Sequence, residues 1–177
     1  MDIYFLRHAN AGEPRLDPAK DEKRPLDQLG IQQSHDVGRA LAAMDISVDS
    51  VISSPLRRAT QTAAFVAKEI RHKDDVITDA ALRPGATYEQ FQQLLSRYNG
   101  KDAIMVVGHN PNLTEFLNRV LSGDGNLRAI ELKKGMVARV EKIGRRPGFL
   151  RWCMPPKLVR SIQQASANSS RPKAVSK

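Results

Sequence analysis

The chain lacks the features that mark secreted and membrane-spanning proteins. It has one cysteine, Cys153, which cannot form an intramolecular disulfide, so we expect a reducing compartment, the cytoplasm. No apolar run approaches the roughly 18 residues needed to cross a bilayer. The N-terminus has no basic region, long apolar stretch or small-residue cleavage site. We therefore expect a protein that is neither exported nor held in a membrane.

Several common catalytic and binding motifs are also missing. No glycine-rich loop ends in Gly-Lys-Ser or Gly-Lys-Thr, and Gly123-x-Gly125 lacks the third glycine of a dinucleotide fingerprint. Six residues separate Cys153 from Arg160, not the five of a cysteine-phosphatase loop, so we interpret Cys153 as a buried strand residue. The sequence shows no histidine or cysteine pair at metal-ligand spacing, so we expect no metal.

Acidic residues are absent from the C-terminal end. The chain carries +9, and residues 157–177 hold five Lys and Arg but no Asp or Glu. Little apolar content follows Ile162, so this segment cannot bury enough surface to fold. We expect residues 157–177 to form a basic, disordered tail on a single domain of residues 1–156. A contact with an acidic partner is the alternative for the tail, and nucleic-acid binding is a weaker one.

What is present suits one globular α/β domain. Of the 177 residues, 41% are hydrophobic and 27% are charged. Apolar runs that end in turn-type residues alternate with stretches at helical spacing, which predicts a sheet covered by helices. We expect strands at 3–6, 49–53, 76–77 and 104–107, and helices over about 34–44, 55–70, 87–98 and 111–121. Strands at 129–132, 136–140 and 149–154 are expected to add antiparallel pairs at the sheet edge.

Two histidines follow the two most apolar runs. His8 comes after Ile3–Leu6 and His109 after Ile104–Val107. Side chains at the carboxyl ends of parallel strands meet at one edge of the sheet, where such folds bind ligands. Arg7 precedes the first histidine and can bind phosphate oxygens with a charge that does not titrate. These residues together indicate histidine-based phosphoryl chemistry.

A third segment, Ser54–Thr62, also leaves a strand and enters a helix. The amino end of a helix suits anions, and Arg57 and Arg58 lie in this segment. Two adjacent arginines cannot both point inward from a helix start. We therefore expect one of them to point into the site and the other to point into solvent.

Four motifs together resemble the histidine phosphatase (phosphoglycerate-mutase-like) superfamily. They are Arg7-His8-Ala9, the Ser-Pro-x-x-Arg-Ala-x-Gln-Thr stretch from Ser54 to Thr62, Gly108-His109-Asn110-Pro111, and Arg24-Pro25-Leu26 with Gly30 four residues later. The last motif and the short chain are most similar to the SixA-type phosphohistidine phosphatase branch. The resemblance runs from Met1 to about Pro155. It implies a three-layer α/β/α fold with a mostly parallel central sheet and antiparallel edge strands.

The resemblance also implies roles for the residues of the site. His8 is implied as the nucleophile, and Arg7, Arg58 and His109 are implied to surround the phosphoryl oxygens. Arg58, rather than its neighbour, is thereby assigned to the pocket. Water would then hydrolyse a phospho-His8 intermediate and release inorganic phosphate. No metal or cofactor is implied, because arginines supply the positive charge.

Three further residues are weaker candidates for binding substrate. Arg24 is implied as an additional contact for phosphate or substrate. Asn10 and Asn110 either orient the neighbouring histidines or serve as plain turn and cap residues.

The sequence departs from the family pattern at two places. Ala9 stands where the first motif usually carries glycine, a change that short SixA-like members tolerate. Larger phosphatases of the superfamily carry an acid after the third strand to protonate an alcohol leaving group. Residues 80–85 contain none, and Glu89 is the nearest acid downstream. Protonated imidazole needs less help to leave, so the gap favours phosphohistidine, although it equally fits a sluggish enzyme or an acid from elsewhere.

We therefore expect a histidine acid-type phosphatase, a hydrolase of phosphoramidates or phosphoric monoesters that acts on phosphohistidine proteins. The partner that the resemblance implies is a phosphorelay protein. A phosphatase for small phosphorylated metabolites and a catalytically weak phosphate-binding adaptor remain open. A mutase is less favoured, because the short chain has no room for the insertions that shape a sugar-phosphate pocket.

Overall fold

A central sheet carries helices on both faces in the computed structural model, which describes residues 1–123, 128–142, 144 and 146–169. The strand order is β3-β2-β4-β1-β5-β6. The strands are β1 (Asp2–Arg7), β2 (Ser50–Ser53), β3 (Ile77–Thr78), β4 (Ala103–Gly108), β5 (Val137–Glu141) and β6 (Phe149–Met154). The first four are parallel, and β5 and β6 add two antiparallel pairs at one edge. The expected fold class is confirmed.

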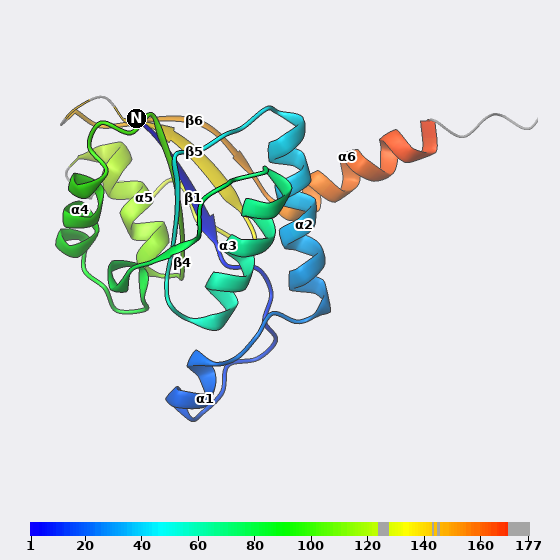
Figure 1. Ribbon diagram of the computed structural model, residues 1–177, viewed down its shortest axis with the longest axis horizontal. Helices are drawn as coiled ribbons and strands as arrows, with labels where there is room; N and C mark the ends of the chain where they lie inside the picture. The colour runs from blue at the N-terminus through cyan, green and yellow to red at the C-terminus, as the bar shows by residue number, and fades with distance from the viewer. Residues whose placement is uncertain (124–127, 143, 145, 170–177) are drawn as a thin grey trace, which may run out of the picture.

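The helices form the two outer layers. One face of the sheet is covered by α2 (Gln28–Ala43) and α3 (Arg57–Glu69), and the other by α4 (Tyr88–Arg97) and α5 (Asn112–Ser122), as Figure 1 shows. Each face has its own apolar core, one around Phe5, Phe91 and Phe116 and one around Leu6, Leu41 and Val66. Short helices α1 (Pro18–Glu22) and η1 (Ala80–Leu82) lie in connections.

The two central strands explain where the histidines meet. The residues of β1 and β4 from Ile3 to Leu6 and from Ile104 to Val107 are buried, as expected of parallel strands covered on both faces. Their register pairs Arg7 with Gly108. His8 and His109 therefore leave neighbouring strands at the same level and at the same edge of the sheet.

Two expected local structures are wrong. The Pro- and charge-rich composition from Gly12 to about Pro25 predicts a loop, but the segment contains α1, because the Asp17 side chain accepts hydrogen bonds from the first-turn N–H groups and Pro18 starts the helix. Residues 129–132 are not a strand. Their backbone groups pair with side chains of α5 instead: Asn118 bonds both the N–H and the carbonyl of Ile130, and Thr114 accepts from the Leu132 N–H.

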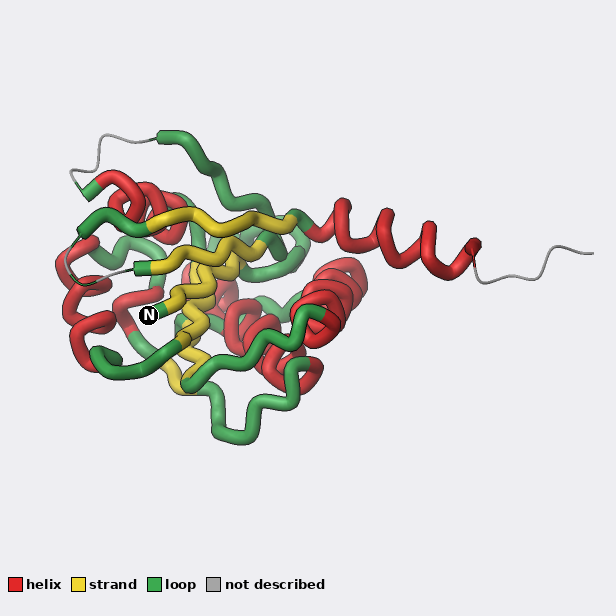
Figure 2. The backbone as a smooth tube through the Cα atoms, turned by 90° about the horizontal axis from the view of Figure 1, so that it is seen from above, coloured by secondary structure: helices red, strands yellow, loops and turns green. Residues whose placement is uncertain are grey.

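The C-terminal end is more ordered than the composition predicts. Pro156–Ser169 form α6, so the prediction of a disordered tail from 157 onward is wrong as far as Ser169. The helix is held because Val159 is buried and the Gln163 side chain bonds the Asp36 carbonyl of α2. Residues 170–177 lie outside the described part of the chain. Beyond this contact, α6 projects from the body, as Figures 1 and 2 show.

Two smaller findings concern exposure. Cys153 lies in a strand as expected, but it is exposed, because β6 is the edge strand and half or more of its side chains are exposed. None of the helices in the described ranges is long and apolar enough to span a bilayer.

Candidate active site

His8 is held in one tautomer at the end of β1. It is only 7% exposed, and its Nδ1 lies 2.7 Å from the Ala9 carbonyl oxygen. A carbonyl oxygen only accepts, so Nδ1 carries the proton and Nε2 keeps a free lone pair. The Ala9 N–H donates to Thr62 Oγ1 (3.1 Å), and the Gly135 N–H donates to the His8 carbonyl (3.1 Å). The backbone is thus fixed on both sides of an imidazole in the nucleophilic form.

His109 faces His8 from the end of β4. Their ring centroids are 4.9 Å apart, and His109 is 3% exposed. Its Nε2 lies 2.8 Å from Ser54 Oγ, which also accepts from the Leu56 N–H. In the tautomer in which the Ser54 hydroxyl donates to Nε2, the His109 proton lies on Nδ1. That Nδ1 is buried without a hydrogen-bond partner in the protein.

Arg7 and Arg58 are each anchored at one end of the guanidinium. Arg7 Nη1 donates to the Leu132 carbonyl (2.9 Å), and Arg58 Nη1 donates to the Asp21 carbonyl (2.9 Å) and faces its carboxylate at 3.1 Å. The Nε atoms of both arginines are buried and have no partner in the protein. Arg58 is 5% exposed, whereas Arg57, one position earlier in α3, is exposed.

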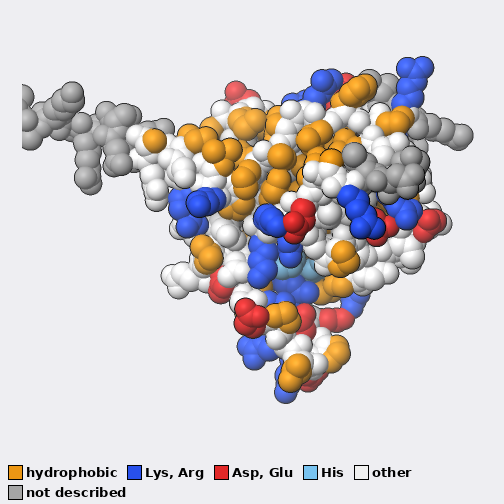
Figure 3. Space-filling view, turned by 180° about the vertical axis from the view of Figure 1, so that it is seen from behind, with side chains coloured by type: hydrophobic (Ala, Val, Ile, Leu, Met, Phe, Trp, Pro, Cys, Tyr) orange, Lys and Arg blue, Asp and Glu red, His pale blue; other side chains and the backbone are white. Residues whose placement is uncertain are grey.

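Three buried donors thus surround His8 with unused hydrogens: Arg7 Nε, Arg58 Nε and His109 Nδ1. An unpaired buried donor costs about 1–3 kcal/mol, and more for a charged group. A tetrahedral oxyanion beside His8 is the kind of ligand that accepts hydrogen bonds from several such donors. Figure 3 shows histidine atoms at the bottom of a hollow flanked by Lys and Arg side chains.

Burial and positive charge keep both imidazoles neutral. Burial is the largest cause that lowers the pKa of His8 to about 3; the Ala9 hydrogen bond opposes it, and the charges of Arg58, Arg7 and Arg24 add to it. Burial likewise lowers the pKa of His109 to about 2, with smaller effects from His8, Arg58 and Arg7. A neutral His8 is what a nucleophile requires, and the same arginines that lower its pKa attract a phosphoryl group.

These pKa values predict how stability depends on pH. Between the usual histidine pKa of 6.5 and about 3, the unfolded chain binds protons that the folded His8 does not. The free energy of unfolding should therefore fall as the pH drops below 6.5, and it should fall less steeply in His8→Asn. In an NMR titration, the imidazole signals of His8 and His109 should stay those of the neutral form from pH 8 to about 5. A midpoint near 6.5 for either ring would contradict this account of the site.

Arg24 supports the site through Asp21. The Arg24 Nε donates to Asp21 Oδ1 (2.8 Å), and Nη1 donates to the carbonyls of Ala11 (2.6 Å) and Gly12 (3.0 Å). The other oxygen of the Asp21 carboxylate faces Arg58. Asp21 therefore joins the two guanidiniums and holds α1 against the site. The sequence reasoning missed Asp21, although an acid three residues before Arg24 was the available signal.

The two asparagines hold loops. Asn10 donates to Asp27 Oδ2 (2.6 Å) and accepts from Lys134 Nζ (2.9 Å). Its carbonyl approaches α2 so closely that a Cβ at Gly30 would lie 1.9 Å from it, which explains the glycine. Asn110 donates to the Leu132 carbonyl (2.8 Å), the acceptor that Arg7 also uses. The hydrogen bonds of both asparagine side chains go to loop and helix residues rather than to an imidazole.

Two hydroxyl residues belong to the site although the resemblance implied no role for them. Ser54 and Thr62 are the first and last residues of the Ser54–Thr62 stretch, and both are fully buried. Ser54 orients His109, and Thr62 accepts from the Ala9 N–H while donating to the Arg58 carbonyl (2.7 Å). The available signal was a hydroxyl side chain at each end of the Ser54–Thr62 stretch.

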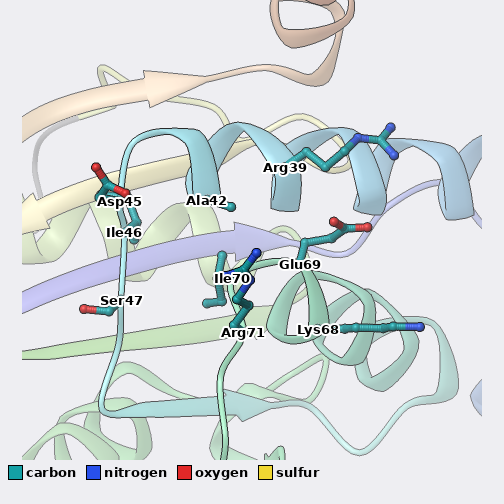
Figure 4. Close-up of a pocket in the computed structure, with 9 residues that line it drawn as sticks. All are labelled: Arg39, Ala42, Asp45, Ile46, Ser47, Lys68, Glu69, Ile70 and Arg71. Atoms are coloured by element: carbon teal, nitrogen blue, oxygen red, sulfur yellow. The ribbon is translucent and has the colours of Figure 1, made fainter.

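Neither metal ligands nor the cavity between α2 and α3 give a further residue for this site in the described part of the chain. Within the described ranges, no group of three or more His, Cys, Asp or Glu side chains could hold a metal ion. A cavity of about 680 Å³ lies between the C-terminal ends of α2 and α3 (Figure 4). It is lined by residues such as Arg39, Asp45, Lys68 and Arg71 and by none of the candidate residues.

Solved structures share the fold. A structure of the protein histidine phosphatase SixA complexed with tungstate superposes with a TM-score of 0.77 and 21% identity, over 89% of this chain and 98% of that one. The phosphoglycerate-mutase-like architecture expected from the resemblance is confirmed.

Sequence comparisons identify the family. Residues 3–84 match the model of the histidine phosphatase superfamily (branch 1). An uncharacterized protein of Picosynechococcus sp. is 32% identical over 154 residues, which cover 85% of this chain and 88% of that protein. Phosphohistidine phosphatase SixA of Escherichia coli (strain K12) is 27% identical over 117 residues, 63% of this chain and 68% of that protein. The chain belongs to the histidine phosphatase superfamily.

Proposed function

We propose that this protein is a phosphohistidine phosphatase that works through a phospho-His8 intermediate. Family membership supports a phosphatase. The observation that carries the proposal is the set of three unused buried donors, Arg7 Nε, Arg58 Nε and His109 Nδ1, around an imidazole whose Nε2 is free. Nucleophile and oxyanion donors are the two parts that phosphoryl transfer requires.

In the first step, His8 Nε2 attacks phosphorus in line with the leaving nitrogen. The bond from Nε2 to phosphorus forms as the bond from phosphorus to the substrate imidazole breaks. A substrate imidazole protonated at its other nitrogen leaves as a neutral base. His8 keeps its Nδ1 proton on the Ala9 carbonyl and becomes a phosphoimidazolium. Arg7, Arg58 and His109 stabilise the charge on the equatorial oxygens.

In the second step, water attacks phosphorus on the face that the leaving group has vacated. The bond from phosphorus to Nε2 breaks and its electron pair returns to His8, which is neutral again with Nδ1 protonated. Dihydrogen phosphate leaves and loses a proton to solvent. No proton has to be delivered to an alkoxide at either step.

The carboxyl groups of Asp21, Glu22 and Glu89 favour this substrate class. Burial raises the pKa of Asp21, but hydrogen bonds from the Arg15 N–H and the Arg24 side chain outweigh this, and the pKa lies below its ordinary value. Glu22 is paired with Arg83. Hydrogen bonds at the start of α4 lower the pKa of the exposed Glu89. A general acid for an alcohol leaving group needs a raised pKa, whereas the pKa values of Asp21 and Glu89 are lowered.

Turnover on different phosphoryl compounds tests the proposal. We expect kcat/KM on free phosphohistidine to exceed that on alkyl and sugar phosphates by about 10²-fold or more, because general acid catalysis contributes about 10²–10⁴-fold where an alkoxide must leave. An aryl phosphate, whose phenolate leaves without protonation, should lie between them. Faster turnover on a sugar phosphate would favour the small-metabolite phosphatase. Phosphate-ester affinity without turnover on any substrate would favour the adaptor.

The physiological partner and compartment belong to the same proposal. A phosphorelay protein that carries phosphohistidine is the proposed partner, and inorganic phosphate is the product. The similarity to the Escherichia coli protein named phosphohistidine phosphatase SixA supports this assignment. The cytoplasm is proposed because of the single cysteine.

A further inference from the structure

The positive charge of the chain is concentrated in its last quarter. Residues 133–177 contain twelve Lys and Arg and a single acid, Glu141, and thus carry +11, whereas residues 1–132 carry −2. The described part of this segment forms β5, β6 and α6, which are the antiparallel edge of the sheet and the helix that projects from it (Figures 1 and 2). Such an asymmetry within one domain favours an acidic binding partner.

This basic edge begins beside the active site. The Gly135 N–H donates to the His8 carbonyl, and a Cβ at Gly135 would lie 2.9 Å from Pro156, the first residue of α6. Lys134, next to Gly135, donates to Asn10 Oδ1 in the loop after His8. Gly135 therefore lies between the backbone of His8 and the first residue of α6. A protein whose phosphohistidine enters the pocket would meet α6 immediately outside it.

The two sides of α6 differ. Val159 and Gln163 face α2, where Val159 is buried and Arg160 lies 3.7 Å from the buried Asp36 carboxylate. Leu158 and Ile162 are four residues apart, share one side of the helix, and are 48% and 56% exposed. Figure 3 shows apolar side chains gathered on the face from which the histidine atoms are visible.

Two lysines of this edge are exposed. Lys157 precedes Leu158 in α6, and Lys133 lies on the loop that leads to Gly135, where its Nζ pairs with Glu131 (2.6 Å). We call Lys133, Lys134, Lys157, Leu158 and Ile162 the C-terminal surface. An apolar spot bordered by lysines fits a protein partner that presents apolar side chains among carboxylates.

We propose that the C-terminal surface docks the protein that carries the phosphohistidine and that this partner is acidic where it contacts α6. This rests on the proposed function. A free phosphohistidine fills only the pocket around His8, so it gains nothing from α6. A protein substrate gains electrostatic attraction during approach and apolar burial after contact, both of which lower KM without changing the chemistry in the pocket.

The test compares one protein substrate with one small substrate. The protein is an acidic histidine-containing phosphotransfer domain phosphorylated with phosphoramidate, and the small substrate is free phosphohistidine. The variant Lys157→Glu/Leu158→Asp changes two exposed side chains of the surface. Lys133→Glu changes the loop outside α6, so that an effect does not depend on the folding of that helix. The matched control, Lys68→Glu/Met44→Asp, alters an exposed lysine and a 45%-exposed apolar residue at the far ends of α3 and α2.

We expect KM for the phosphorylated domain to rise about tenfold in Lys157→Glu/Leu158→Asp and severalfold in Lys133→Glu, and added salt should raise the wild-type KM toward these values. The kcat/KM for free phosphohistidine should be unchanged in both variants. The control variant should keep the wild-type KM for the domain and the wild-type kcat/KM for free phosphohistidine. Equal losses on both substrates, or no loss on the domain, would overturn the docking proposal.

A binding measurement separates this proposal from the proposed function. If the wild-type enzyme hydrolyses neither substrate, the proposed function fails. The docking proposal is then tested by the affinity of the enzyme for the unphosphorylated domain. Weaker binding in Lys157→Glu/Leu158→Asp supports the surface. If the variant instead loses binding to duplex DNA or to anionic phosphatidylserine vesicles while its affinity for the domain is unchanged, docking of a protein substrate is refuted.

Discussion

Replacing His8 with alanine is expected to lower kcat on phosphohistidine by about 10⁴-fold or more, because covalent transfer to Nε2 is then lost. The free Nε2 depends on the hydrogen bond from Nδ1 to the Ala9 carbonyl, and no other imidazole except His109 lies at the site. His109 cannot replace it, since its Nε2 is bonded to Ser54. Steady-state turnover of a purified variant measures the loss.

Two further measurements make this result specific. Brief mixing with a labelled phosphoryl donor should give an acid-labile, alkali-stable adduct in the wild type and none in His8→Ala. His35→Ala removes an imidazole that pairs with Glu69 between α2 and α3, and it should retain wild-type turnover. An adduct that persists in His8→Ala would place the nucleophile elsewhere.

Replacing Arg58 with alanine is expected to lower kcat by about 10²–10³-fold, the usual effect of removing one oxyanion donor. Arg58 Nε is one of the three unused buried donors, and its charge acts directly on His8. Arg58→Lys should restore little, because an ammonium cannot bind Asp21 and an oxyanion with the geometry of a guanidinium. Turnover on free phosphohistidine, with folding checked by thermal unfolding, measures the effect.

The neighbouring arginine is the control for this prediction. Arg57 occupies the preceding position of α3 and is exposed. Arg57→Ala should therefore change turnover on free phosphohistidine by less than about twofold. Equal losses at Arg57 and Arg58 would show that the loss comes from the charge of the helix start rather than from a specific donor in the pocket.

The central part of the fold was predictable because strong, local patterns specify it. The runs Ile3–Leu6 and Ile104–Val107 are continuously apolar, which favours strands buried on both faces, and a parallel pair places whatever follows them at one edge of the sheet. Thr87, the first residue of the helix predicted over 87–98, forms a capping box with Gln90. The position of His8 relative to His109 follows from two apolar runs and their shared direction.

The features that escaped prediction depend on contacts between distant segments. Residues 129–132 have a strand-like composition, but Asn118 and Thr114 of α5 bind their backbone, and Leu132 thereby orients Arg7. Helix α6 forms although its composition is mostly polar, because the Val159 side chain is buried against α2. Asp21 lies in a loop by composition and acquires its role only when Arg24 and Arg58 converge on it.

A crystal structure of the protein with bound tungstate, a tetrahedral oxyanion, tests the central claim most directly. We predict the anion beside His8 Nε2, with its oxygens within about 3 Å of Arg7 Nε, Arg58 Nε and His109 Nδ1. A tungstate that binds only elsewhere, such as in the cavity between α2 and α3, or that leaves these three donors unpaired, would contradict the account.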